Sequence, residues 1–264
     1  MHEIDAVLPD ATGTSGFHPD RRRWLIGGAA LIGITWLGGC ATSTQPNPPA
    51  GVGPRVEPPR LVPGDEWRFD VVNRYNGERQ RAFVRRVVAS TAQELRCEVR
   101  TDGAAAMVVE QYAPGWNPAQ RSAGPGLADY RFEPSLTAFQ FPLEAGKSWV
   151  VRLAGTDAVT RRRNRVVVRG QVEGWERIRV PAGEFDTLRI RRDIELGDGD
   201  MFRSQTEVLE TEWYAPQLGG VVRSDIRSEY WQTASPADPG GGAPRMKGDW
   251  EVASLTGWSR GPGA

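Results

Sequence analysis

The amino-acid sequence predicts a mostly β fold, built as a single antiparallel curved sheet, a half-barrel or a sandwich. Apolar and polar residues alternate along segments such as WRFDV from Trp67 and TLRIRRDIEL from Thr187. A period of two is typical of a strand with one wet face. Turn sequences separate these segments, for example the Asn76-Gly77 pair and GDGD at residues 197–200. No stretch shows the 3.6-residue period of a strong amphipathic helix.

Four segments carry the alternation most clearly. The residues that share one face of each are, in chain order, Trp67, Phe69 and Val71; Leu95, Cys97 and Val99; Leu188, Ile190, Ile194 and Leu196; and, on a polar face, Arg223, Asp225, Arg227 and Glu229. Arg192 interrupts the apolar face of the third segment. We expect Cys97 to be a buried, inert thiol because it lies on an apolar face.

Two pairs of segments resemble each other. VPGDEW, which ends at Trp67, is similar to EAGKSW, which ends at Trp149, and the tripeptide Tyr-Ala-Pro occurs at Tyr112 and at Tyr214. The tryptophan lies 45 residues before the tyrosine in the first half (112 minus 67) and 65 before it in the second (214 minus 149). This pattern predicts two diverged β-meander repeats, the second with about one extra hairpin; the alternative is chance similarity of turn-rich sequence.

The N-terminal region has the features of an export signal. Arg21–Arg23 precede an apolar run from Trp24 to Leu37, and 14 residues are enough for a signal-peptide core but short for a membrane span. The LGGC that ends at Cys40 resembles the bacterial lipobox, so Cys40 is the predicted site of lipidation, with palmitate among the expected acyl groups. The alternative is an ordinary signal peptide with a chance cysteine.

Two neighbouring features concern the export route and the destination. Arg21 and Arg22 resemble the twin-arginine signal, although an arginine-rich Sec signal explains them equally well. Ala41 follows the cysteine, where lipoproteins retained at the inner membrane often carry aspartate. We therefore expect a protein anchored to the membrane by its N-terminal lipid, in the outer membrane and facing the periplasm.

Composition excludes several classes of function. Three of the 33 basic and four of the 33 acidic residues precede Cys40, which leaves 30 and 29 in the mature chain and gives no electrostatic basis for nucleic-acid binding. Both histidines, His2 and His18, leave with the leader. Without imidazole the mature chain can form no Ser-His or Cys-His catalytic pair and no histidine-ligated zinc or haem. We therefore predict no enzyme activity, no catalytic residue, no metal and no cofactor.

The predicted organisation has four parts. Residues 1–39 form the signal peptide, and 40–63 the lipidated cysteine and a proline-rich tether without secondary structure, which could extend about 70 Å at about 3 Å per residue. Residues 64–234 form the β-rich domain. Residues 235–264 form a loose C-terminal segment that could contain one last strand.

The sequences VPAGEFDTLRI, from Val180, and ETEWYAPQLGGVVRSD, from Glu210, resemble the paired pattern of the TapB-like family, exported bacterial lipoproteins of unknown function. The similarity covers about residues 144–231, and Gly219-Gly220 departs from the family's more usual single glycine. The resemblance implies an exported lipoprotein with a curved sheet, and it supplies no catalytic residue.

Aromatic content favours a non-catalytic binding module for an apolar ligand or lipid, because eight of the ten tryptophans follow Cys40. Trp116 and Trp258 are expected in loops, where a core role is less natural, and with Tyr112 and Tyr214 they are the candidate ligand-binding residues. Trp67, Trp149 and Trp213, at strand starts, are better explained as core.

Two other functions are possible from the sequence. Arg163, Arg165 and Arg169 would project from one face of a strand, and that face could dock on an envelope protein partner; a solvated strand edge also explains them. The other is an enzyme, in which Asp198 and Asp200 would form a calcium loop or a carboxylate pair, although a hairpin turn explains them more simply. Glu184 and Asp186, on either side of Phe185, are the other acidic candidates, and they are equally explained as exposed loop acids.

Overall fold

The computed structural model describes residues 53–122, 127, 129–197, 203–233 and 243–262. The signal peptide, Cys40, Asp198 and Asp200 therefore lie outside the described residues. The chain divides into the units Met1–Thr44 and Gln45–Ala264, and the strands of the described residues all lie in the second. Among the described residues, no helix has the length and apolar character needed to cross a membrane.

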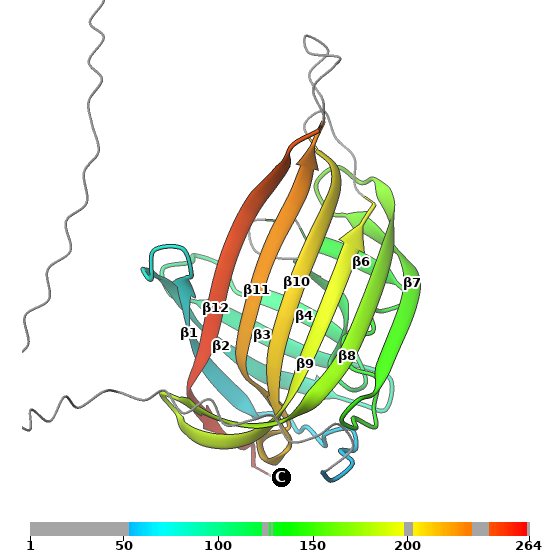
Figure 1. Ribbon diagram of the computed structural model, residues 1–264. Helices are drawn as coiled ribbons and strands as arrows, with labels where there is room; N and C mark the ends of the chain where they lie inside the picture. The colour runs from blue at the N-terminus through cyan, green and yellow to red at the C-terminus, as the bar shows by residue number, and fades with distance from the viewer. Residues whose placement is uncertain (1–52, 123–126, 128, 198–202, 234–242, 263–264) are drawn as a thin grey trace, which may run out of the picture. The chain divides into compact units, whose positions relative to one another are not determined.

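Twelve antiparallel strands form this second unit (Figure 1). They are β1 Glu66–Asn73, β2 Arg79–Ser90, β3 Leu95–Thr101, β4 Val108–Ala113, β5 Asn117–Ser122, β6 Asp129–Glu133, β7 Ser148–Asp157, β8 Arg163–Val180, β9 Gly183–Leu196, β10 Arg203–Ala215, β11 Gly220–Gln232 and β12 Arg245–Ser259. A short 3-10 helix, Pro216–Leu218, connects β10 to β11.

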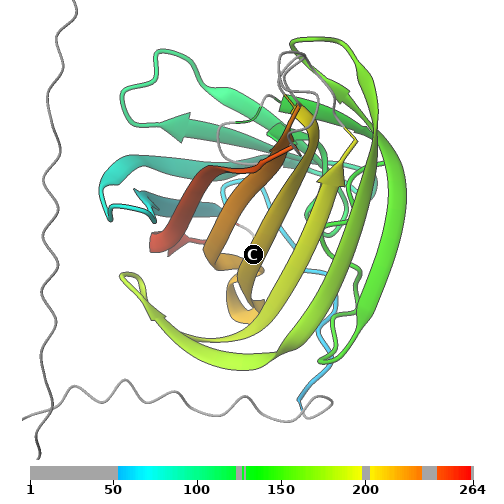
Figure 2. The same cartoon turned by 45° about the horizontal axis from the view of Figure 1, so that its top comes forward.

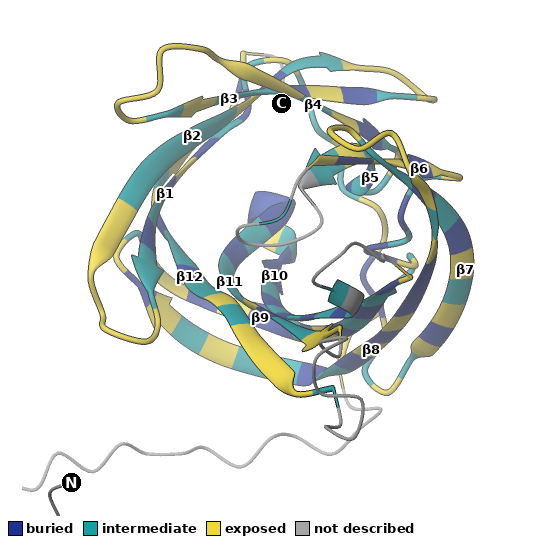
Figure 3. Cartoon of the chain, turned by 90° about the horizontal axis from the view of Figure 1, so that it is seen from above, coloured by how far each residue is buried: buried dark blue, intermediate teal, exposed yellow. Residues whose placement is uncertain are grey.

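The strands close into a barrel, so the expected open sheet, half-barrel or sandwich is wrong, whereas the mostly β character is confirmed. Each strand pairs with its neighbours in sequence, and β1 pairs with both β2 and β12. The strands form a ring when the barrel is viewed along its axis (Figure 3). The closing strand, β12, lies in the C-terminal segment that was expected to be loose, with one possible last strand. Alternation shows that a strand has a buried face, but it carries no information on whether the first and last strands pair.

The long strands β8–β12 form one side of the barrel and the shorter β2–β6 lie opposite (Figures 1 and 2). Along β9 the inward residues are Leu188, Ile190, Arg192, Ile194 and Leu196, all at most 1% exposed. The predicted apolar face of this segment is therefore the barrel interior, and Arg192 is turned into it. A segment between β6 and β7 adds Leu136, Ala138, Phe139 and Leu143 to the core.

The two halves of the barrel share local structure. The Gly64 N–H donates to the Val87 carbonyl at 2.8 Å, and the Gly146 N–H donates to the Val172 carbonyl at the same distance. The similar tryptophans, Trp67 and Trp149, are the second residues of β1 and β7. Both Tyr-Ala-Pro sequences end the fourth strand of their half, β4 and β10.

The longer second half contains no extra hairpin, contrary to the expectation. Its β8, β9 and β10 have 18, 14 and 13 residues, against 12, 7 and 6 in β2, β3 and β4. The differences of 6, 7 and 7 residues account for the 20 residues that separate the two spacings. Longer strands therefore replace the predicted additional ones.

Part of the predicted tether packs against the barrel. Val56 is buried and forms a two-bond β-bridge with Leu143, at 2.9 and 2.8 Å. The ring of Pro59 and the side chain of Leu61 lie beside Gly219. Residues 53–63 therefore belong to the folded unit, contrary to the expectation of a tether without secondary structure.

Candidate functional site

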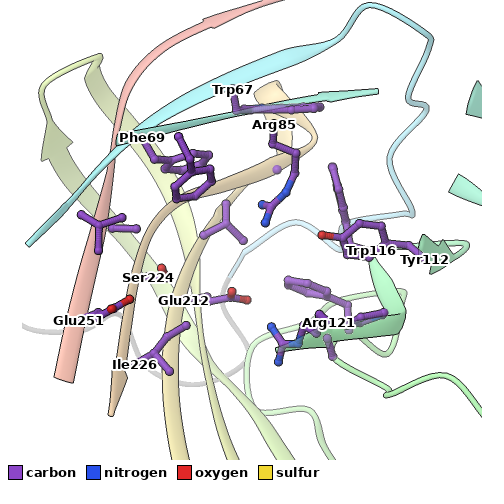
Figure 4. Close-up of a pocket in the computed structure, with 18 of the residues that line it drawn as sticks. Trp67, Phe69, Arg85, Tyr112, Trp116, Arg121, Glu212, Ser224, Ile226 and Glu251 are labelled. Atoms are coloured by element: carbon purple, nitrogen blue, oxygen red, sulfur yellow. The ribbon is translucent and has the colours of Figure 1, made fainter. Parts of the chain in front are cut away.

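The barrel interior contains a cavity of about 190 Å³ (Figure 4). Its wall comes from β1, β2, β4, β5, β9, β10, β11 and β12, and from the segment that contains Ala138 and Phe139. Of the lining residues, Arg192 on β9 is fully buried, whereas the side chain of Arg81 on β2 is 38% exposed. The Arg81 end is therefore nearer to solvent.

Aromatic rings form one side of the cavity. Trp116 makes edge-to-face contacts with Trp67 and Tyr112, with ring centroids 5.4 and 5.1 Å apart. Phe69 and Phe83 stack across β1 and β2 at 4.9 Å. The indole N–H of Trp116 donates to the Gly219 carbonyl at 2.7 Å, which fixes the ring although Trp116 sits in the turn between β4 and β5.

Ionic side chains form another side. Arg192 donates to Glu210 at 2.8 Å, to Glu212, and to the Ala138 carbonyl at 3.1 Å, while Arg121 reaches Glu210 from β5 at 2.7 Å. The guanidinium of Arg192 also lies 5.1 Å from the ring centre of Phe139. Burial alone would raise the pKa of Glu210, but the charges of Arg121 and Arg192 outweigh it and hold that pKa below its usual value.

A second ionic group adjoins the aromatic side. Arg85 donates to Glu110 at 2.9 Å, and the Tyr112 hydroxyl donates to the same carboxylate. Burial opposes the charge of Glu110, but Arg85 and the two hydrogen bonds keep its pKa below the usual value. Arg81 forms a bidentate pair with Glu251 at 2.7 and 2.6 Å.

The structure brings two of the four candidate ligand-binding residues together. Trp116 and Tyr112 line the cavity, and Trp116 lies in a loop as expected. Tyr214 is buried behind it, packed against Phe139 with ring centroids 5.6 Å apart. Trp258 is in β12, not in a loop, and 41% exposed. The repeated Tyr-Ala-Pro sequence does not indicate which of its two tyrosines, Tyr112 or Tyr214, lines the cavity.

The four cavity arginines were not among the candidates; they are Arg81, Arg85, Arg121 and Arg192. Only Arg192 left a signal in the sequence, as the single charge on an apolar strand face. The others lie on strands whose alternation is weak. The inward direction of these side chains depends on register and barrel closure, which a single strand does not encode.

The remaining candidates lie elsewhere. Cys97 is fully buried, and burial raises its pKa to about 12. Arg163 pairs with Glu133 at 3.2 Å and Arg169 with Glu195 at 2.6 Å on the exposed surface of the barrel. Glu184 and Asp186 likewise pair with arginines, Arg179 and Arg177. Within the described ranges no group of three or more His, Cys, Asp or Glu residues is placed to hold a metal ion.

The solved structures similar to this chain include three bacterial proteins. A candidate lipoprotein from Parabacteroides distasonis is 12% identical with a TM-score of 0.45, and the match covers 78% of this chain and all of that one. A candidate exported protein with a YmcC-like fold from Bacteroides fragilis is 14% identical over the same shares, with a TM-score of 0.40. The hypothetical lipoprotein YmcC of Escherichia coli is 9% identical over 74% of this chain and 85% of its own, with a TM-score of 0.36.

No protein-family model matches the chain, so membership of the TapB-like family is not confirmed. No curated protein matches it. Similarities as low as those to the three structures identify neither a family nor a function. The chain is similar to exported bacterial proteins and lipoproteins whose names state no activity.

Proposed function

We propose that this chain is a lipid-anchored bacterial envelope lipoprotein whose barrel is a non-catalytic binding module for an apolar ligand or the apolar part of a lipid. The observation that carries the binding proposal is the aromatic wall of the cavity, to which Trp67, Tyr112 and Trp116 contribute contacting rings. Concave, mostly apolar spaces with a few polar groups are the usual sites for small ligands.

The volume limits what the cavity can hold. A space of about 150 Å³ lined by apolar residues holds a benzene molecule, and this cavity is about 190 Å³. It therefore accommodates a substituted ring or the last few methylenes of a chain, not a whole phospholipid. A longer ligand would keep its remaining part beyond the Arg81 end, which is the end nearer to solvent.

Intrinsic fluorescence tests the binding proposal, because two tryptophans line the cavity. The form that begins at Ala41 is titrated with a monoacylglycerol, a fatty acid and a phospholipid in separate experiments. We expect at least one of them to shift the tryptophan emission with saturation. Unchanged emission, with no heat of binding by calorimetry, would contradict the proposal.

A blocking variant locates the binding site. Ala253 faces the cavity from β12, so Ala253→Phe should fill it and abolish the fluorescence response. Thr256→Phe is the matched control, because Thr256 is exposed on the same strand. Equal binding by both variants would show that the ligand occupies some other surface.

Lipid anchoring rests on the LGGC sequence and has a separate test. Cells that express the full chain are labelled with radioactive palmitate and fractionated. We expect label and membrane association with the native sequence, and neither with Cys40→Ser. A membrane-associated, unlabelled native protein would refute lipidation at Cys40.

A further inference from the structure

We infer that the ligand of the cavity is an anion, with an apolar body and a carboxylate head group that Arg85 and Arg121 bind. This inference rests on the proposed function and specifies the chemistry of its ligand. Two observations carry it: the charges at the surface of the cavity are predominantly positive, and two of the guanidinium groups there keep a donor that a ligand can reach.

The side chains at the surface of the cavity carry more positive than negative charges. The charged residues that line it are four arginines and two glutamates, namely Arg81, Arg85, Arg121, Arg192, Glu212 and Glu251. Each of the two glutamates is paired within this set, Glu212 with Arg192 and Glu251 with Arg81. The two remaining arginines, Arg85 and Arg121, have no carboxylate partner among the lining residues.

The carboxylate partners of Arg85 and Arg121 lie behind the surface of the cavity. Arg85 pairs with Glu110 at 2.9 Å and Arg121 with Glu210 at 2.7 Å, and neither glutamate lines the cavity. A negative group inside the cavity would therefore be nearer to the two guanidinium groups than to these carboxylates, and Coulomb energy falls with distance. The two arginines act in one region of the barrel, because the charges of both lower the pKa of Glu110.

Arg85 and Arg121 each keep one donor group that is reachable. Arg85 donates to Glu110 through Nε and Nη2, and Arg121 donates to Glu210 through Nη2. Within the described residues neither Nη1 makes a hydrogen bond, and neither belongs to the buried, partnerless atoms that are closed to solvent, whereas the Nε of Arg121 does. Figure 4 shows both guanidinium groups directed into the cavity, from β2 and from β5. The two Nη1 groups are therefore donors for a ligand in the cavity.

A carboxylate satisfies these two arginines better than the other classes of ligand do. Hydrogen bonds between a guanidinium and a carboxylate group are about twice as strong as neutral ones, and this gain offsets the cost of removing the anion from water. A neutral carbonyl would gain only weaker hydrogen bonds, a hydrocarbon would gain none, and a cation would be repelled. Together with the aromatic wall, the arginines favour a fatty acid or an aromatic acid.

Four probes built on one aromatic ring separate these classes. Ethylbenzene is a hydrocarbon, benzamide is neutral and has nearly the shape of benzoate, benzoate is an anion and benzylammonium is a cation. Their binding to the form that begins at Ala41, which contains the whole barrel unit, is measured by calorimetry at pH 7. We expect benzoate to bind about tenfold more tightly than benzamide, as the difference between a charged and a neutral hydrogen bond implies, and benzylammonium to bind more weakly than either.

A charge variant tests the role of Arg121. Arg121→Gln removes the guanidinium group, while Glu210 keeps Arg192 as a partner, so the preference for benzoate over benzamide should fall several-fold. Arg169→Gln is the matched control, because it also removes one arginine of an ion pair and Arg169 does not line the cavity. Equal preferences in the two folded variants would refute binding of the anion by Arg121; should Arg121→Gln not fold, the order of the probes on the native chain decides.

The outcomes distinguish this inference from the proposed function. Benzamide, ethylbenzene or benzylammonium binding as tightly as benzoate would overturn the inference and leave a binding cavity in place. Benzoate binding that survives Ala253→Phe would also overturn it, since the anion would then occupy another surface. Failure of all four probes to bind would count against the proposed function itself, and with it against the inference.

Discussion

Arg192 and Glu210 form an ion pair inside the barrel, with a distance of 2.8 Å between Nε and Oε2 and with both side chains at most 1% exposed. The two residues lie directly opposite each other on β9 and β10. Arg121, on β5, pairs with the same carboxylate at 2.7 Å. Glu210 therefore links β5 to β9 and β10, which are distant from it in the sequence. Its carboxylate also neutralises the charge of Arg192 inside the barrel.

Replacement of Glu210 should destabilise the barrel strongly. Glu210→Gln leaves buried guanidinium groups without full compensation, and breaking one side of a buried pair costs about 3–5 kcal/mol. Urea denaturation followed by circular dichroism measures the change. Asp186→Asn is the control, because its partner Arg177 is exposed, and it should leave the midpoint almost unchanged. Equal midpoints for the two variants would refute this role of Glu210.

Acid should destabilise the barrel through Glu110 and Glu210. Their pKa values in the folded state lie below the ordinary value of 4.5, so the unfolded chain binds protons first as the pH falls. Stability from these groups is thus complete above about pH 4.5 and is lost as the pH falls through the folded pKa values. Urea midpoints at pH 7, 4.5 and 3.5 check this. Glu110→Gln should flatten the decline, and a native-like slope in that variant would contradict the assignment.

Cys97 should resist thiol reagents in the native protein. Its side chain is fully buried, and burial raises its pKa to about 12, so the thiolate that reacts is scarce at pH 8. The form that begins at Ala41 contains no other cysteine. We expect almost no reaction with Ellman's reagent over an hour and rapid reaction of one thiol in guanidinium chloride. Rapid labelling of the native form would show that the strand pair around Cys97 opens.

Gly170 should tolerate no side chain. It lies opposite Trp149 in the β7–β8 pair, and a methyl group on it would overlap the indole ring of Trp149. Overpacking of this kind costs about 1–3 kcal/mol or more, so Gly170→Ala should lower the melting temperature by several degrees. Gly257→Ala is the control, because the nearest atom to its new methyl group would be in the Arg68 side chain at 3.5 Å. Equal melting temperatures would contradict the tight contact.

The docked N-terminal segment should contribute to stability. A form that begins at Gly53 keeps the bridge between Val56 and Leu143, whereas a form that begins at Gly64 lacks it. Two backbone hydrogen bonds and one buried valine together are worth about 2–4 kcal/mol. The Gly64 form should therefore unfold at a lower urea concentration. Equal midpoints would mean that residues 53–63 bind the barrel without stabilising it.

The fold could be predicted from the sequence as far as local pattern determines it. Leu95 and Cys97 are buried on one strand face, as their spacing indicates, because side-chain direction alternates within any strand. The equivalent positions of Trp67 and Trp149 also follow from sequence similarity. Barrel closure could not be predicted, since the pairing of β1 with β12 joins residues almost 200 positions apart, such as Glu66 and Ser259.

The candidate site divides in the same way. The tryptophans indicated an aromatic interior, and Trp116 does line the cavity, but Trp258 has similar local sequence features and lies on the surface. Whether a ring faces a cavity depends on strand register and on what the opposite wall contributes. The docking of residues 53–63 could not be predicted from the sequence either, because a proline-rich stretch shows no periodicity that would indicate a buried face.

By itself, the sequence determined the strand character of the chain, the apolar faces of its strands, the buried position of Cys97 and the absence of histidine after residue 18. These properties depend on residue types and on separations of a few positions. Only the tertiary structure decided that the sheet closes, that four arginines and four glutamates pair inside it, and that aromatic and ionic side chains meet around a cavity. Those features arise where strands distant in sequence meet, and the free energy of such contacts is a property of the assembled barrel.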